Sequence, residues 1–183
     1  MKESADMFGR RNRRELWLLL AVLALSLPIP QHATAVEINV TVALQDAVDG
    51  VFSREVVFHA GPDSEPLKTW TETLQFSGGT AAITLSGAPS EMESLSAKTS
   101  FHLRRRISCI PDNGKATADF TNENELLGGD LNGDNVVDIQ DFNRLRYHWF
   151  SENDQADITG NGSTGQADYN VMKSNWHVKG DGE

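Results

Sequence analysis

The stretch GDLNGDNVVDIQDF, residues 129–142, decides how the C-terminal part of this chain folds. It places oxygen-bearing side chains at positions 1, 3, 5, 9 and 12 of a twelve-residue loop, namely Asp130, Asn132, Asp134, Asp138 and Asp141. Calcium is a hard cation that takes six to eight oxygen ligands, and alternating acidic residues let a tightly wound loop point several of them inward. Val136 at position 7 adds its backbone carbonyl. The spacing predicts a calcium site.

A second copy of this pattern follows at an offset of 27 residues. The stretch ADITGNGSTGQADY, residues 156–169, supplies candidate ligands at positions 1, 3, 5, 7 and 12, namely Asp157, Thr159, Asn161, Ser163 through its carbonyl, and Asp168. Matching residues at one offset indicate a duplicated loop–helix unit. The first loop has four carboxylates and the second has two, and ligand charge helps to set affinity, so we expect two sites with the first binding more tightly.

The two loops also carry residues suited to the backbone shape of a calcium loop. Position 6 is Asn135 in the first loop and Gly162 in the second, and both residue types tolerate the left-handed conformation required there. Val137 at position 8 is expected to face the core and to pair with the other loop. Each loop ends in Asp instead of the Glu of ordinary EF-hands, and no amphipathic helix precedes either loop. The unit is therefore a loop followed by one helix.

A duplicated loop–helix unit with Asp at position 12 resembles the type I dockerin family. The resemblance covers about 50 residues, 129–178, and implies an all-α pair of antiparallel loop–helix units that folds with calcium and binds a cohesin-like protein. In that family, positions 10 and 11 of each loop carry much of the partner recognition, often as a Ser-Thr pair. The residues expected at the partner face are those four positions and two helix residues, namely Ile139, Gln140, Gln166, Ala167, Arg144 and Lys173. None of the four loop positions is Ser or Thr, so the usual cohesin specificity is in doubt.

Residues 36–120 have the pattern of short strands. Apolar and polar residues alternate from Val36 to Leu44, with the period of two of a half-buried strand. Further candidate strands are residues 55–59, 69–76, 81–85 and 101–107, separated by turn pairs such as Gly78-Gly79. We expect a small antiparallel β-sandwich of immunoglobulin-like size, joined by a polar linker, residues 121–128, to the all-α dockerin-like domain and a tail, residues 179–183. The sandwich region has no comparable ligand cluster, so we expect it to fold without calcium.

Residues 1–35 are typical of a secretory signal peptide. A patch of four arginines between residues 10 and 14 precedes an apolar run, residues 16–27, and Ala33-Thr-Ala35 offers a cleavage site. The run is shorter than a membrane-spanning helix, so no span is expected after cleavage, and either the general or the twin-arginine export route fits. The whole chain has a net charge of −10. Five basic and three acidic residues give this segment a charge of +2, so residues 36–183 have a net charge of −12. That charge argues against nucleic-acid binding.

The sequence contains no nucleophile elbow, zinc helix motif or phosphate loop, so we expect no catalytic residues. The expected function is that of a secreted or cell-surface calcium-binding protein whose C-terminal module attaches it to a protein partner, as in a polysaccharide-degrading or cell-surface assembly. One alternative is an accessory carbohydrate-binding or glycoside-hydrolysing protein that contacts glycan, which a row of exposed aromatic residues on one sheet face would favour. The other alternative is a simple calcium buffer.

Overall fold

The structure is a computed structural model that describes residues 35–62, 64–152 and 155–182. The described residues belong to one compact unit, which contains both the strands and the two loop–helix units. The predicted signal peptide lies outside the described residues, apart from its last residue, Ala35. No helix in the described part of the chain is long and apolar enough to cross a membrane.

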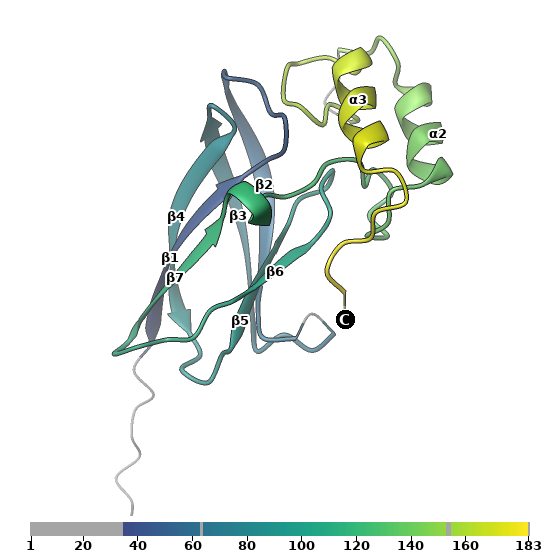
Figure 1. Cartoon of the computed structure of the whole chain (residues 1–183). Coiled ribbons are helices and arrows are strands. Elements are labelled where there is room, and N and C mark those ends of the chain that lie inside the picture. The colour runs from purple at the N-terminus through teal and green to yellow at the C-terminus, as the bar shows by residue number, and fades with distance from the viewer. Residues whose placement is uncertain (1–34, 63, 153–154, 183) are drawn as a thin grey trace, which may run out of the picture. The chain divides into compact units, whose positions relative to one another are not determined.

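In the described part of the chain, seven strands form a single sheet in the order β6-β5-β2-β3-β4-β1-β7 (Figure 1). Their bounds are β1 Val36–Ala43, β2 Val51–Ala60, β3 Lys68–Ser77, β4 Thr80–Ala88, β5 Ser94–Lys98, β6 Arg105–Ser108 and β7 Lys115–Phe120. The alternation expected in the first strand is present, because every second residue of β1 is buried. The strand-rich character predicted for this region is therefore confirmed.

The predicted fold class, an antiparallel sandwich followed by an all-α pair, is wrong. β1 pairs with β4 in antiparallel orientation but with β7 in parallel orientation, so the sheet is mixed. β3 and β4 pair in antiparallel orientation at Ser77 and Thr80, on either side of the Gly78-Gly79 turn. The edge strands β6 and β7 approach each other, which leaves the seven-stranded sheet nearly closed, like a barrel. Alternating burial predicts that a strand has one buried face, but it does not determine which strands become neighbours.

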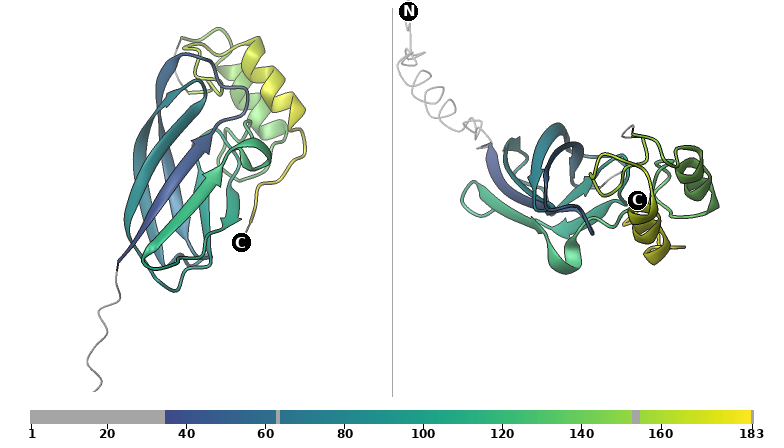
Figure 2. Two further views of the ribbon diagram at one scale, coloured as in Figure 1. Left: turned by 60° about the vertical axis from the view of Figure 1, so that its left-hand side comes forward. Right: turned by 90° about the horizontal axis from the view of Figure 1, so that it is seen from above.

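The C-terminal part contains two α-helices among the described residues, α2 (Ile139–Tyr147) and α3 (Gln166–Ser174), and most of the rest of it is loop. They lie side by side in both views of Figure 2. A short 3-10 helix, η2 (Asn122–Asn124), lies within the predicted linker. Nine residues are too few for a helix to be stable alone in water, so packing must stabilise both helices.

The two helices share their hydrophobic core with a segment of the sheet region. The buried residues of this core are Leu103, Leu131, Val137, Leu145, Ala156, Ile158, Val171 and Met172. Leu103 belongs to the connection between β5 and β6, and Phe101 from the same connection packs against the cluster. The backbone of this connection also bonds to the residues before the first loop, since Leu103 N donates to Leu127 O at 2.8 Å and Gly129 N donates to Phe101 O at 2.8 Å. The loop–helix units therefore fold against the sheet region.

Val137 is buried as expected, but its backbone pairs with a different segment from the one predicted. Val137 N donates to Val178 O at 3.0 Å, and His177 N donates to Val137 O at 2.9 Å. Thr164, the equivalent residue of the second loop, bonds in the same way to the chain that follows α2. Each loop thus pairs with the segment after the other unit's helix, and the pairing with the other loop is wrong. The predicted tail also joins this structure, because Lys179 forms a bridge with Val136.

Candidate metal centre

Asp141, at position 12 of the first loop, is fully buried and organises the loop around its carboxylate. Its Oδ1 accepts hydrogen bonds from Leu131 N at 2.8 Å and Asn132 N at 2.9 Å, and its Oδ2 accepts one from Asp138 N at 2.8 Å. The last of these bonds is half of a capping box, in which Asp138 caps the start of α2. The same residue therefore closes the loop and begins the helix.

Asp130, at position 1, is the second fully buried carboxylate of this loop. Its Oδ1 accepts from Gly133 N at 2.7 Å and its Oδ2 from Asn135 N at 3.1 Å. Burial raises the pKa of Asp141, and the charge of Asp130 raises it further, against the three backbone hydrogen bonds that lower it. Two carboxylates of like charge are thus held together out of water, an arrangement that a bound cation would stabilise.

The other predicted ligands of the first loop are half-buried or exposed and form local turns. Asn132 Oδ1 accepts from Asp134 N at 2.9 Å, and Asp134 Oδ1 accepts from Val136 N at 3.0 Å. Asp138 Oδ1 accepts from Gln140 N at 2.7 Å at the start of α2. Asn135 adopts the expected left-handed conformation, with a φ of 68°. The backbone shape expected from the sequence is therefore present.

The second loop repeats the hydrogen bonds of the first. Asp157 accepts from the backbone of positions 4 and 6, Gly160 N at 2.9 Å and Gly162 N at 2.8 Å. Asp168 accepts from positions 3 and 9, as Asp141 does, through Thr159 N at 3.0 Å and Gly165 N at 2.8 Å. The Thr159 hydroxyl lies 3.4 Å from Asp157 Oδ1 and 3.1 Å from Asp168 Oδ1. The duplication seen in the sequence is thus also a duplication of hydrogen-bond geometry.

Two further ligand candidates of the second loop, Asn161 and Ser163, are exposed. Asn161 Oδ1 accepts from Ser163 N at 2.9 Å, a local turn like those of the first loop. Both loops thus combine an inner pair of buried carboxylates with outer, more exposed oxygen atoms.

The donor chemistry of both loops fits a hard divalent cation, since it consists of carboxylate, amide, hydroxyl and carbonyl oxygen. The fit is strongest for the two buried pairs, Asp130 with Asp141 and Asp157 with Asp168. Within the described ranges, no group of three or more His, Cys, Asp or Glu side chains is arranged so that it could hold a metal ion. The full set of predicted ligands therefore stays a prediction, with the two buried pairs as its structural basis.

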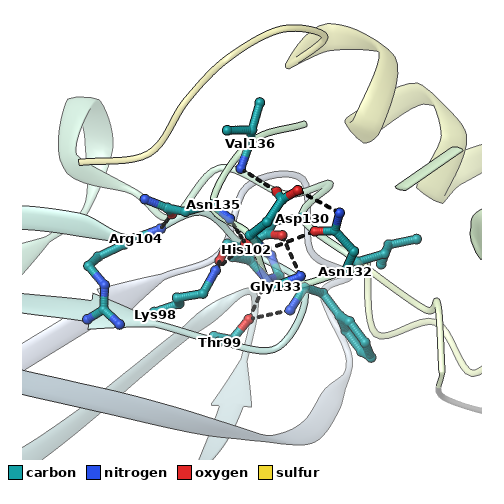
Figure 3. Close-up of polar contacts among 12 residues, drawn as sticks. Lys98, Thr99, His102, Arg104, Asp130, Asn132, Gly133, Asn135 and Val136 are labelled. Carbon is teal, nitrogen blue, oxygen red and sulfur yellow. Dashed lines mark hydrogen bonds and ion pairs between the residues drawn. The ribbon is translucent and has the colours of Figure 1, made fainter. Parts of the chain in front are cut away.

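Sequence reasoning missed a group of residues through which the sheet region contacts both loops. Lys98, the last residue of β5, forms an ion pair with Asp130 (Figure 3). Arg54 of β2 donates from Nη2 to the carbonyl oxygen of Asp157 at 2.8 Å, and this bond is buried. The backbone N of Arg104 donates to Asn135 Oδ1 at 2.7 Å. These contacts join residues 31 to 103 positions apart, so no local spacing in the sequence could have indicated them.

His102 lies beside this contact and is fully buried. Its Nδ1 is 2.8 Å from the Thr99 hydroxyl, and its backbone forms a bridge with Gly128. Burial, together with the positive charges of Arg54 and Lys98, lowers the pKa of His102 to about 3. The imidazole is therefore neutral at physiological pH, and the charged side chain that contacts Asp130 is that of Lys98.

The residues predicted to bind a partner do not all lie on one surface. Ile139 and Lys173 line an apolar groove of about 360 Å³ between the start of α2 and the end of α3, together with Phe142, Tyr169 and Trp176. Gln166 and Ala167 are exposed at the start of α3 and do not line this groove.

Arg144 is separate from that groove. It lines a different cleft, beside Phe101 and Tyr147, and its guanidinium donates to Leu131 O at 3.2 Å. The groove is therefore lined by two of the six predicted residues, Ile139 and Lys173, and the exposed Gln140 follows Ile139 in the chain. Gln166, Ala167 and Arg144 do not line it.

No protein-family model matches this chain, and a search of curated proteins finds no match either.

Proposed function

We propose that this chain is a secreted, non-catalytic calcium-binding protein whose C-terminal loop–helix units attach it to a protein partner. Calcium binding is supported by the repeated geometry of the two loops, each with a buried carboxylate pair that accepts hydrogen bonds from backbone N–H groups at positions 3 and 4. Buried carboxylates of like charge are costly unless a cation compensates them. In the first loop Lys98 pairs with Asp130, so calcium, when bound, would compensate chiefly the other carboxylates of the two loops and would keep the loops wound at the starts of α2 and α3.

Calcium titration of the chain by calorimetry tests the metal part. Asp130→Ala removes one of the four carboxylates of the first loop and its position-1 ligand, so it should eliminate the binding step of that loop, while Asp157→Ala should eliminate the step of the second loop. Asp130 also holds two backbone N–H groups and Asp157 holds three, so calcium affinity at the mutated loop should fall below the measurable range. Matched titrations with magnesium control for simple charge screening. A wild-type chain that gives no calcium-dependent heat or stabilisation would refute the metal part.

The groove between α2 and α3 is the surface that best supports the attachment part. Ile139 is 56% exposed and Trp176 is 37% exposed, and both line the groove. Apolar side chains that remain exposed next to one another are typical of a surface that a partner covers. The resemblance to dockerins suggests a folded, cohesin-like protein as that partner. Such a partner would bury the apolar groove and meet Lys173 at its edge.

Changing Ile139 and Gln140 together to Asp tests this surface. Carboxylates at the first turn of α2 are favourable for the helix, so the fold should persist, whereas a charged groove should weaken partner binding by about tenfold or more. Partner capture from the secreted fraction, with and without chelator, should be compared for this variant and the wild type. Asn143→Asp with Asn170→Asp adds the same charge to exposed helix positions outside the groove and is the control. Full capture by the double Asp variant would place the partner surface elsewhere.

The glycan-binding alternative requires a row of exposed aromatic residues on the sheet. In the part of the chain that the structure describes, the exposed large aromatic residues are Tyr147, Phe150 and Trp176, all in the loop–helix units. The exposed large hydrophobic residues of the described strands and their connections are aliphatic, namely Val51, Leu67 and Ile110. This distribution supports the attachment proposal over a glycan-binding sheet.

A further inference from the structure

The first loop is contacted by a positive charge that belongs to the sheet. Lys98 Nζ pairs with Oδ2 of Asp130 and also donates to the carbonyl oxygen of His102 at 3.2 Å. The side chain of Lys98 is 15% exposed, and that of Asp130 is fully buried. Figure 3 shows the lysine reaching Asp130 from the side of the sheet. This is a buried ion pair in which one member is the expected position-1 metal ligand.

Asp130 does not depend on Lys98 for its position. Its carboxylate is also held by Gly133 N and Asn135 N, two backbone groups of the loop itself. Removing the ammonium would therefore remove a charge while these two hydrogen bonds remain. The charge matters because charges interact several times more strongly at a partly buried site than in water.

We propose that Lys98 is a built-in counter-ion of the first loop, which stabilises the metal-free protein and lowers the affinity of that loop for calcium. Without metal, the ammonium compensates Asp130, whose neighbour Asp141 is also buried. A calcium ion bound in the first loop would lie close to the Lys98 ammonium, because both would be neighbours of the Asp130 carboxylate. Repulsion between the two positive charges would oppose binding. This inference rests on the proposed calcium-binding function and goes beyond it, because it makes a residue of β5 a determinant of calcium affinity.

The inference also changes the expected ranking of the two sites. Four carboxylates against two predict tighter binding at the first loop, but one of those four is already paired with Lys98. The carboxylate count therefore overstates the net charge that the first loop offers to calcium. With Lys98 paired to Asp130, the first loop would need a higher calcium concentration for half-saturation than its carboxylate count predicts.

Replacing Lys98 with Met, which keeps most of the apolar stem and removes the charge, tests the inference. Calorimetry with calcium alone, in the wild-type chain and in an Asp157→Ala background that isolates the first loop, should show about tenfold tighter binding for Lys98→Met. Thermal unfolding in chelator should show the opposite effect, a lower melting temperature, because Asp130 loses its counter-ion. Lys179→Met is the matched control, since Lys179 and Lys98 both line a cleft beside Gly133 and Asp134 of the first loop, and it should change affinity by no more than about threefold.

The outcomes separate this inference from the proposed function. Wild-type binding that is unchanged or weakened by Lys98→Met would overturn the counter-ion role alone. Equal tightening by Lys179→Met would also overturn it, since general electrostatics would then explain the effect. Failure of both the wild type and Lys98→Met to bind calcium or to be stabilised by it would overturn this inference and the proposed function together.

Discussion

Chelation of calcium is expected to lower the melting temperature of the strands and the helices together, by roughly 10–20 °C relative to saturating calcium. A ligand present at 100 times its dissociation constant adds ~2.7 kcal/mol of stability per site, and for a chain of this size 1 kcal/mol shifts the melting temperature by about 2–4 °C. The effect should reach the sheet because Leu103 and Phe101, from the β5–β6 connection, pack in the core of the helices. This result would replace the sequence-based expectation that residues 36–120 fold independently of metal.

Circular dichroism followed at strand and helix wavelengths, with tryptophan fluorescence as a second probe, measures this coupling. The two signals should change in one transition, at a temperature that rises with calcium concentration. A double variant, Asp130→Ala with Asp157→Ala, should lose the dependence on calcium and serves as the control. Loss of helical signal in chelator with an unchanged strand transition would show that the two regions unfold independently.

Replacing Gly160 with Ala should destabilise the chain by about 1–3 kcal/mol more than the same change at Gly162. Both glycines lie in the second loop with positive φ, 78° and 86°, so both substitutions carry the same kind of backbone strain. A Cβ at Gly160 would lie 2.8 Å from Cγ of Phe52, whereas a Cβ at Gly162 would meet nothing within 4 Å. The difference between the two variants therefore isolates the packing of the second loop against β2.

Phe52 has little freedom to move away from such a contact. Its ring stacks on Phe76 with centroids 5.5 Å apart, and the guanidinium carbon of Arg54 lies 5.5 Å from its centroid. Denaturant unfolding of the two glycine variants gives the difference in free energy. Adding Phe52→Ala should abolish most of the extra cost of Gly160→Ala, as a double-mutant cycle would show. Equal destabilisation by the two glycine variants would mean that the loop and β2 separate at little cost.

Several features of this protein follow from short stretches of its sequence. The left-handed residue at position 6, Asn135 in one loop and Gly162 in the other, adopts the expected conformation. Each helix begins directly after position 9, because the Asp at position 12 binds back to the backbone there. These features involve groups within a dozen residues of one another, so the local sequence contains all the atoms that decide them.

The pairing of the strands could not be predicted from local sequence patterns. The period of two in β1 predicts its buried face, but β5 and β7 were not predicted, because short strands of small and polar residues such as Ser94–Lys98 have no distinctive pattern. The parallel pairing of β1 with β7 depends on which edge of the sheet the chain returns to. The position of β7 beside β1 depends on the packing of the whole sheet, and the residue pattern of a single strand contains no information about that packing.

The sequence alone determined that two oxygen-rich loops, each followed by a short helix, recur at a fixed spacing. Tertiary structure alone decided what surrounds them: the Lys98 ammonium at Asp130, the Arg54 guanidinium at the carbonyl of Asp157, and the Phe52 ring against Gly160. The physical reason is that ligand spacing is a property of a dozen consecutive residues. The charge and packing around a loop come instead from segments that only the folded chain brings together.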